Sequence, residues 1–294
     1  MSNKKKAIIF GASGQNGYFL TKTCNENNIE VTGVSRSEGN WLKGDVSKKE
    51  FVQNLIKENQ PDFIFHLAAN STTRHSALFE NHETISTGTL NILETVKEFV
   101  PHAKVFITGS GVQFKNHGLA IKETDEFEAS SVYSVARIHS VYAARYYRSI
   151  GIKTYVGYLF HNESPLRKPH HISKMTTDYV KQILKGNNDK LILGDISVSK
   201  EWAFAGDIAE GIFTLVNQDL IHEATIGTGV TYSIQEWLEV CFGLAGKNWK
   251  EYIVSGNDNF VPEYSILFSN PETIFSLGWK PKTPFQQLAK IMMQ

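Results

Sequence analysis

The sequence predicts an α/β protein: a doubly wound parallel sheet with helices on both faces and a smaller, irregular C-terminal α/β lobe. Short apolar runs alternate with longer helical patterns through the first two thirds of the 294 residues, which is typical of repeated βα units. The first apolar run ends in a cluster of glycines. Six of the eight prolines follow residue 161, where the alternation stops, and proline interrupts both helices and central strands.

Five apolar runs are predicted as strands because each is short and lies between helical patterns or turn residues. They cover residues 7–10, 30–34, 62–68, 104–110 and 153–160. Helical patterns between them cover residues 16–27, 48–59, 83–99 and 133–149. We therefore expect residues 1–160 to form the sheet domain and residues 161–294 to form mainly the lobe, with some later segments returning to the sheet.

The charges balance, with 30 basic and 30 acidic side chains. A chain without a basic excess has no global field to gather phosphate backbones or anionic lipid, so nucleic acid and membrane surfaces are not expected partners. Cys24 and Cys241 lack the spacing of a disulfide framework or a zinc site. No apolar stretch approaches the length of a membrane span. We expect a cytoplasmic protein without a metal.

The glycine cluster has the spacing G-x-x-G-x-x-G, formed by Gly11, Gly14 and Gly17. A strand, a glycine turn and a helix in succession are the fingerprint of dinucleotide binding. The first glycine permits the tight turn, the second lets the pyrophosphate approach, and the third lets the helix pack on the sheet. The sequence therefore predicts a Rossmann-type cofactor site, whose other members in this turn are Ser13, Gln15 and Asn16.

The second predicted strand is followed by Ser35 and Arg36. An NAD site normally has a carboxylate here for the ribose 2′-hydroxyl, whereas a hydroxyl and a guanidinium suit a 2′-phosphate. NADP(H) is the predicted cofactor, and Glu38 keeps NAD(H) as the alternative. Ligands of such sheets bind at the carboxyl ends of the strands, so the predicted cofactor site also includes Asp45, Val46, Leu67, Ala68 and Ala69.

Three further residues predict proton transfer beside a nicotinamide. Ser110 ends a predicted strand, and Tyr133 and Arg137 lie one turn apart on a predicted helix, so their side chains share a face. A tyrosine with a pKa near ~10 is a weak acid–base catalyst at neutral pH, and a fixed cation beside it stabilises the phenolate. We expect Ser110 to bind the same substrate oxygen.

With these residues the chain resembles the extended short-chain dehydrogenases/reductases. More narrowly, it resembles the branch of GDP-mannose 4,6-dehydratases and GDP-4-keto-6-deoxymannose reductases. The motifs that carry the resemblance include GASGQNG (11–17), HLAAN (66–70), VYSVAR (132–137) and LFHNESPLR (159–167), the last being similar to that branch's LFNHESPRR.

This resemblance implies more of the site and its partners. It adds Phe160, Asn162 and Arg167 to the cofactor residues. A nucleotide-diphosphate sugar, GDP-linked, is the implied substrate, and its implied contacts are Ser71, Glu163, Ser164, Lys174 and Lys200. The branch also implies a homodimer or homotetramer, formed through the helices predicted at 83–99 and 133–149.

Four positions depart from that branch. Arg137 replaces a lysine; it keeps the charge but cannot release a proton. Val112 stands where the dehydratases have the acid that removes the C5 proton, and the neighbouring Gln113 cannot replace that acid. Val261 stands where an arginine binds the sugar diphosphate, and Ile85 stands where the branch has Asn or Asp.

These departures favour a reductase. The leading hypothesis is NADPH-dependent reduction of the C4 ketone of a GDP-linked 4-keto-6-deoxy sugar, in the synthesis of sugars for surface polysaccharide. Tyr133 would donate the proton, Ser110 would orient the carbonyl and Arg137 would set the charge. Three alternatives stay open: a GDP-mannose 4,6-dehydratase-type lyase with rearranged acid–base groups, a nucleotide-sugar 4-epimerase, and a non-catalytic NADP(H)-binding protein.

Overall fold

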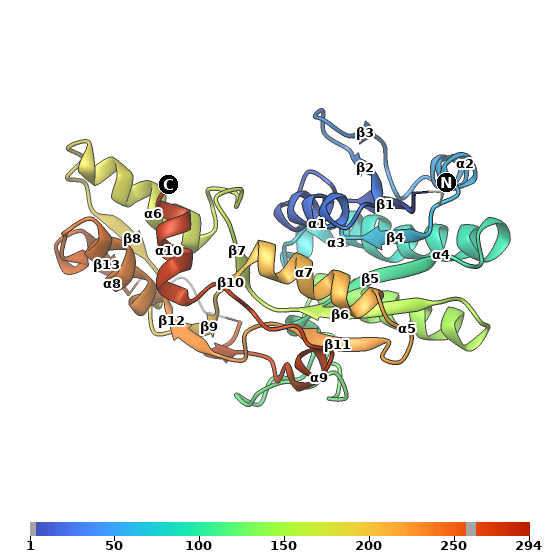
Figure 1. Ribbon diagram of the computed structural model, residues 1–294. Coiled ribbons are helices and arrows are strands. Elements are labelled where there is room, and N and C mark those ends of the chain that lie inside the picture. Colours follow the sequence, from blue (N-terminus) through green and yellow to red (C-terminus); the bar gives the residue numbers. More distant parts are fainter. Residues whose placement is uncertain (1–3, 257–262) are drawn as a thin grey trace.

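The computed structural model describes residues 4–256 and 263–294, so Val261 lies outside the described residues. A seven-stranded sheet, in which every pair of neighbouring strands is parallel, forms the centre in the order β11-β6-β5-β4-β1-β2-β3 (Figure 1). Its strands are β1 Lys6–Phe10, β2 Glu30–Ser35, β3 Leu42–Lys43, β4 Phe63–His66, β5 Lys104–Ser110, β6 Thr154–Leu159 and β11 Glu223–Ile226. The chain builds outward from β1 in both directions, so the order reverses between β1 and β4.

Helices cover both faces of the sheet. α1 Gln15–Glu26 and α7 Ala205–Val216 pack on one face, and α2 Lys49–Asn59, α4 Gly88–Phe99 and α5 Val132–Ser149 pack on the other (Figure 1). Along β1, Ile8 and Phe10 belong to the α2–α4–α5 core, whereas Ala7 and Ile9 belong to the α1–α7 core. Both sides of β1 are therefore buried, as is all of β4, which explains why these central strands read as nearly unbroken apolar runs.

The predicted α/β fold is confirmed, and the elements before residue 160 fall within a few residues of their expected positions. Two local features differ. The helix expected at 83–99 is preceded by α3 Leu78–Asn81 and begins as a π-helical segment, His82–Thr87. A two-residue edge strand, β3, was not predicted, because a pair of exposed residues carries no periodic signal.

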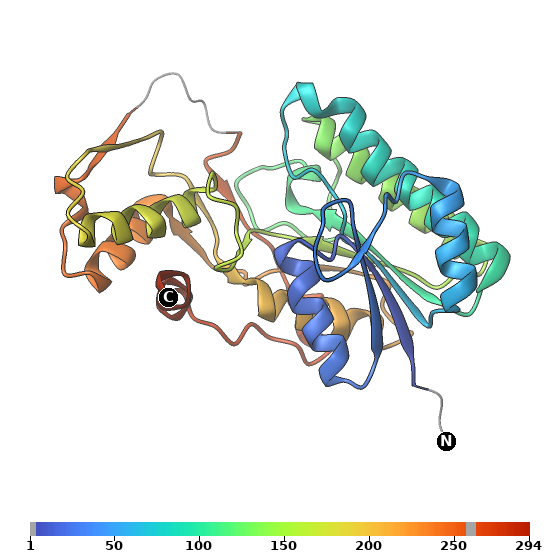
Figure 2. The ribbon, with the colours of Figure 1, turned by 90° about the horizontal axis from the view of Figure 1, so that it is seen from above.

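The lobe is built from residues after β6, although α7 and β11 return to the layers of the sheet domain. Its core lies among α6 Ile172–Leu184, α8 Ile234–Leu244 and α10 Phe285–Met293. Trp202 stacks on Trp237 at 4.6 Å between ring centroids, and Phe285 packs against both. Figure 2 shows this lobe beside the sheet domain, with the C-terminus inside it. The division at residue 160 stays a prediction.

Short strands connect the rest of the lobe. β7 Asn162–Glu163 pairs with β10 Ala203–Phe204, β8 Leu191–Leu193 with β13 Ile253–Ser255, and β9 Ser199–Glu201 with both β12 Thr231–Ser233 and β14 Ile266–Leu267. The remaining short helix, α9 Glu272–Ser276, lies against β11. In the described parts of the chain, no helix has both the length and the apolar character needed to cross a membrane.

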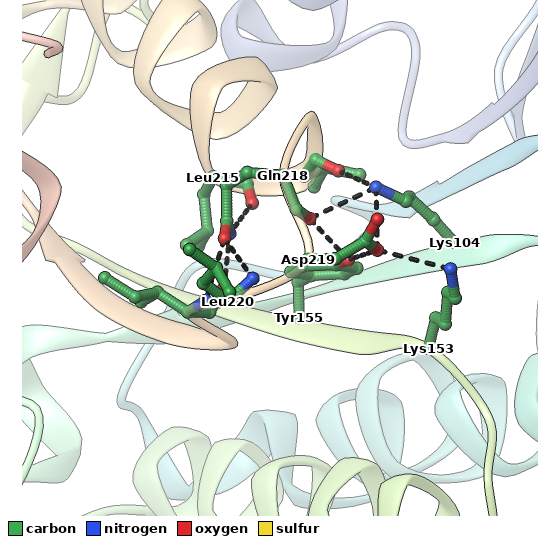
Figure 3. A network of polar contacts seen from close by, with 9 residues as sticks. Lys104, Lys153, Tyr155, Leu215, Gln218, Asp219 and Leu220 are labelled. Carbon is green, nitrogen blue, oxygen red and sulfur yellow. Dashed lines mark hydrogen bonds and ion pairs between the residues drawn. The ribbon is translucent and has the colours of Figure 1, made fainter. Parts of the chain in front are cut away.

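A polar network fixes the connection between α7 and β11 at the amino ends of the central strands (Figure 3). Asp219 forms ion pairs with Lys104 at 3.2 Å and Lys153 at 3.3 Å, and it accepts a hydrogen bond from the Tyr155 hydroxyl. These contacts lower the pKa of Asp219 to about 2. They join β5, β6 and the returning segment at the amino ends of the strands. The cavities lie at the opposite edge of the sheet, at the carboxyl ends.

Candidate active site

Two adjoining cavities lie at the carboxyl ends of the strands, between the sheet domain and the lobe. The inner cavity, of about 270 Å³, is bounded by Ser110, Tyr133, Arg137 and Tyr264. The outer cavity, of about 700 Å³, extends from the glycine turn to the loop after β2. They share wall residues at their junction, namely Asn16, Leu67, Ser71, Arg167 and His171. A long ligand can therefore occupy both.

The glycine turn opens the outer cavity by bringing three backbone segments close together. Gly11 has φ +93°, and a Cβ there would lie 2.7 Å from the Ala68 amide nitrogen. A Cβ on Gly17 would lie 2.3 Å from the Gly11 carbonyl oxygen. Gly14 is the N-cap of α1, so the free amide groups of the helix start open toward the cavity. The turn is thus a cradle suited to a pyrophosphate.

Side chains at the start of α1 connect the turn to the lobe. Gln15 donates through Nε2 to the Asn162 carbonyl at 2.8 Å and to Asn162 Oδ1 at 3.0 Å, and it accepts from Ser164 Oγ at 2.8 Å. Asn16 lies at the junction of the cavities, and its buried Oδ1 has no partner among the described residues. That oxygen is available to a ligand, whereas Gln15 and Ser164 are occupied with each other.

The far end of the outer cavity contains the residues predicted for the adenosine half. Ser35 Oγ lies 2.7 Å from Ser13 Oγ, and both line the cavity. Asp45 and Val46 also line it, as do Ala68 and Ala69. Arg36 lines the same wall, with its guanidinium paired to Glu80 at 2.7 Å. The structure therefore gathers the predicted cofactor residues of the glycine turn and of the loops after β2, β3 and β4 around one space, whereas Phe160 lines the inner cavity.

Ser110 is held at the end of β5 by the residue three positions later. Its backbone N–H donates to Gln113 Oε1 at 2.8 Å, and Gln113 is fully buried. Gln113 therefore caps the turn Gly111–Gln113 and does not face the ligand. The intervening Val112 lines the inner cavity. At the position where we expect the acid of the dehydratases, the wall of this cavity carries the apolar side chain of Val112.

Arg137 is almost fully buried, at 2% exposure, and lines the inner cavity. Its Nη1 donates to the Thr108 carbonyl oxygen at 2.7 Å, and its Cζ lies 5.0 Å from the centroid of the Tyr133 ring. His66 lies beneath it, and burial together with the Arg137 charge lowers the pKa of His66 to about 3. His66 is thus neutral at physiological pH, and the guanidinium carries the only positive charge of this group.

The π-helical segment presents the backbone carbonyl of Ile85, the residue that departs from the Asn or Asp of the resembling branch. Ile85 is fully buried, and its carbonyl oxygen accepts hydrogen bonds from Thr89 Oγ1 at 2.7 Å and Ser140 Oγ at 3.2 Å. His66 Nε2 lies 3.4 Å from the same oxygen. A π-helical turn displaces carbonyls from the regular helical pattern, so the backbone provides polar support that the Ile85 side chain lacks.

The predicted sugar contacts in the lobe already have protein partners. Glu163 pairs with Arg167 Nε at 3.1 Å and accepts from Ser173 Oγ at 2.6 Å. Lys174 pairs with Asp178 at 2.9 Å. Lys200 is buried over the ring of Trp202, and burial with the nearby Arg167 lowers its pKa to about 8 against the opposing effect of Glu163. Their roles toward a sugar stay predictions.

Several wall residues were not predicted. His161 Nε2 lies 3.2 Å from the Tyr264 hydroxyl, and both residues line the inner cavity. Thr73 and Glu263 line it too, and they hydrogen bond to each other. The acids of residues 123–126 do not line it; Glu123, for instance, accepts from Thr273. The family motif around His161 was the available signal, whereas Tyr264 and Glu263 follow only from the fold.

The residues fit a nicotinamide dinucleotide. The glycine cradle leaves no room for a Cβ at Gly11 or Gly17, and the buried Oδ1 of Asn16 lacks a partner at the junction. Ser110, Tyr133 and Arg137 then lie on the wall of the inner cavity, at the end of such a ligand that would carry the nicotinamide. Among the described residues, no group of three or more His, Cys, Asp or Glu side chains is arranged to hold a metal ion.

Comparison with solved structures supports the same architecture. A dTDP-glucose 4,6-dehydratase from Bacillus anthracis, in complex with NAD, superposes with a TM-score of 0.86 at 20% identity, covering 99% of this chain and 96% of that one. RMD from Pseudomonas aeruginosa, complexed with NADPH, gives a TM-score of 0.85 at 18% identity with the same coverage. At these identities the likeness confirms the fold alone.

Sequence comparison identifies the family. GDP-mannose 4,6 dehydratase 1 of Arabidopsis thaliana is 28% identical over 321 residues, covering 99% of this chain and 89% of the relative. A GDP-mannose 4,6-dehydratase of Vibrio cholerae is 27% identical over 268 residues, covering 81% and 71%. The family model described as GDP-mannose 4,6 dehydratase matches residues 35–292. The expected resemblance is thus confirmed, and the chain belongs to the GDP-mannose 4,6 dehydratase family, an enzyme family of the extended short-chain dehydrogenase/reductase class.

Proposed function

We propose that this chain is an NADPH-dependent oxidoreductase that reduces the C4 ketone of a GDP-linked 4-keto-6-deoxy sugar. The observation that carries the proposal is the wall of the inner cavity. Ser110, Tyr133 and Arg137 share it, as hydride transfer at a carbonyl requires, whereas Val112 occupies the place of the C5 base. A site with the first set and without the base suits reduction and not elimination.

The cofactor is supported by the glycine cradle and by the solved structures of this fold, which hold NAD or NADPH. When bound, it supplies the hydride. We assign the preference for NADP(H) to Arg36, which lines the outer cavity beside Ser35. A guanidinium offers several donors in a planar fork that matches a phosphate.

The proton step belongs to residues of this chain. As the carbonyl carbon gains the hydride, its oxygen becomes an alkoxide and takes the phenolic proton of Tyr133. The phenolate that remains is stabilised by the guanidinium of Arg137, whose Cζ lies 5.0 Å from the ring centroid. Ser110 Oγ donates to the carbonyl oxygen and orients it. Arg137 cannot release a proton, so Tyr133 is reprotonated from water.

The sugar nucleotide is proposed to extend from the inner cavity toward the lobe. The basic residues Arg167, Lys174 and Lys200 come from the segments that close this side, and they would balance the diphosphate once their present partners rearrange. Ser71 lines both cavities, whereas Glu163 and Ser164 would act by holding Arg167 and the glycine turn. Guanine as the base of the nucleotide is proposed from the family alone.

The proposed assembly is a homodimer or homotetramer through α4 and α5. These helices expose Leu90, Val135, Tyr142 and Tyr146, the apolar and aromatic residue types that favour interfaces. A cytoplasmic location is proposed because Cys24 and Cys241 are both free thiols, as expected in a reducing compartment.

A second candidate is GDP-mannose 4,6-dehydration, which the names of the relatives favour. One structural observation supports it: Glu263 and His161 both line the inner cavity. The Glu263 carboxylate is a chemically competent proton acceptor, so a base at a new position would compensate for Val112. His161 is the weaker base of the two, because burial and the nearby charge of Lys200 hold its pKa well below the usual value. The epimerase and non-catalytic alternatives are not favoured by a further observation.

One experiment separates these functions. The purified chain is incubated in D₂O with NADPH and GDP-4-keto-6-deoxymannose, and separately with NADP⁺ and GDP-mannose. The proposed reductase consumes NADPH with one product reduced at C4 in the first reaction and leaves GDP-mannose unchanged in the second. Deuterium at C5 and loss of water from GDP-mannose would instead establish the dehydratase. Interconversion of sugars without net NADPH consumption would establish the epimerase.

Variants test the assignment of residues. Tyr133→Phe removes only the phenolic hydroxyl, which carries the transferable proton, so turnover should fall while NADPH binding stays unchanged. Val112→Glu restores a carboxylate at the usual position of the base; if position alone decides the reaction, this variant gains deuterium exchange at C5. For the dehydratase candidate, Glu263→Gln and His161→Asn are the variants that should abolish water loss.

A further inference from the structure

We propose that Glu80 limits the preference of the outer cavity for NADP(H), acting as a built-in carboxylate that opposes binding of the 2′-phosphate. This inference rests on the proposed NADP(H) dependence and adds a residue that the cofactor motifs do not include. Glu80 belongs to α3, outside the glycine turn and outside the loop after β2. It reaches the cofactor wall through its partners.

Two residues of the cavity wall donate hydrogen bonds to the Glu80 carboxylate, and a third adds a favourable charge. Arg36 Nη2 donates to Oε1 at 2.7 Å, and Asn70 Nδ2 donates to Oε2 at 2.6 Å. Lys168 adds a favourable charge. Arg36, Asn70 and Lys168 all line the outer cavity. The carboxylate thus joins the loop after β2 to the loop after β4 and lies in the field of a cation from the lobe.

The local environment keeps Glu80 ionised. The hydrogen bond from Arg36 is the main cause that lowers the pKa of Glu80, and Asn70 and Lys168 act in the same direction. Its side chain is 41% exposed and that of Arg36 is 51% exposed, so the pair is not locked by packing. Such a pair can loosen when a stronger anion arrives, because exposed ion pairs contribute little free energy.

The charge balance predicts different effects on the two cofactors. A phosphate monoester carries about −1.5 to −2 charges at pH 7, and it would approach Arg36 and Lys168 in the presence of the Glu80 charge. The carboxylate repels this phosphate and occupies one of the guanidinium's donors. The ribose of NAD(H) has a neutral hydroxyl at the same place, which Glu80 does not repel. Glu80 therefore weakens NADP(H) binding selectively.

Glu80→Gln tests this inference because it removes the charge and keeps the shape. Dissociation constants for NADP⁺ and NAD⁺ are measured by calorimetric titration of the full chain. We expect NADP⁺ to bind about five- to tenfold more tightly in the variant, with NAD⁺ changed less than about twofold. The gain should shrink when the ionic strength rises from about 0.01 M to about 1 M, since the groups are exposed.

Glu94→Gln is the matched control. Glu94 is also 41% exposed and paired with a basic residue, Lys97, but it lies on α4 and lines neither cavity. It changes the net charge equally and should leave both dissociation constants unchanged. If thermal unfolding shows that the glutamine variant is poorly folded, Glu80→Ala provides a second way to remove the charge.

The outcomes separate this inference from the proposed function. If the affinity for NADP⁺ relative to that for NAD⁺ is unchanged or reduced in both Glu80 variants, the role of Glu80 is overturned, whatever reaction the enzyme performs. A shift caused by Glu38→Gln and absent from the Glu80 variants would assign the effect to Glu38, which lines the outer cavity, and would overturn the role of Glu80 as well. Failure of every form, wild type included, to bind either dinucleotide would refute the proposed cofactor itself.

Discussion

Replacing Arg137 by methionine tests the electrostatic part of the proposed mechanism. The guanidinium is 2% exposed and its Cζ lies 5.0 Å from the centroid of the Tyr133 ring. If this distance to the ring centroid is taken as the charge separation, Coulomb's law at an effective dielectric constant of about 20 gives ~3 kcal/mol between the guanidinium and a developing phenolate. This corresponds to a loss in kcat on the order of 10²-fold. Methionine is unbranched and uncharged, so it removes the charge, while its shorter side chain still covers part of the cavity wall.

The assay is NADPH oxidation with the 4-keto sugar substrate in excess, with the NADPH dissociation constant measured in parallel. Arg137→Lys restores the residue of the family and is expected to recover most of the lost kcat. The methionine variant also leaves the Thr108 carbonyl without its donor, which costs about 1–3 kcal/mol of folding free energy; thermal unfolding shows whether the protein is still folded. A folded Arg137→Met enzyme with kcat within a few-fold of wild type would refute the reasoning.

Three further predictions concern the framework around the site. Gly17→Ala puts a Cβ 2.3 Å from the Gly11 carbonyl oxygen, so it should lower the free energy of unfolding by about 1–3 kcal/mol and weaken dinucleotide binding in a calorimetric titration. The control is Gly243→Ala on α8, where a Cβ meets nothing; it should leave stability unchanged or raise it by about 0.5–1 kcal/mol. Asp219→Asn should lower the thermal midpoint at pH 7. The folded pKa of Asp219 is depressed to about 2 from 3.8, so its stabilising effect is full above pH 3.8 and is lost as pH falls toward 2. The midpoints of the variant and the wild type should therefore converge near pH 2, and a difference that persists there would contradict this. Glu201→Gln should lower the free energy of unfolding, measured in urea, by about 2–4 kcal/mol. The buried side chain accepts hydrogen bonds from Ser269, Thr228 and Gly229 through both of its oxygens, and a glutamine amide can accept through only one. An unchanged urea midpoint would show that these contacts add nothing to stability.

The sheet domain was predictable because its central strands are buried on both faces. β1 and β5 read as continuous apolar runs for that reason, and the helix patterns between them repeat at the expected spacing. The lobe lacked such a signal. Its strands are two or three residues long, too short for any periodicity, and its arrangement depends on aromatic contacts such as Trp202 on Trp237. Those contacts join residues that no local pattern relates.

The site was predictable where a local spacing determines the geometry. The glycine turn depends on backbone conformation at Gly11 and Gly17, and the sharing of one cavity by Tyr133 and Arg137 follows from their separation by one helical turn. Contacts across the sheet were not predictable in this way. Glu80 reaches Arg36 from 44 residues away in sequence, and Arg137 donates to a backbone carbonyl, an acceptor that every residue possesses and no sequence marks.

Two departures from the family gain a common meaning in the structure. The arginine at position 137 holds its proton permanently, and the valine at position 112 leaves no carboxylate beside Ser110. A carboxylate there would also compete with the Tyr133 phenolate for the buried guanidinium of Arg137, which has no charged neighbour in His66. In the proposed mechanism, the charge of Arg137 acts on the phenolate without that competitor. The same losses that disfavour elimination at C5 would therefore favour the one proton transfer that reduction at C4 requires.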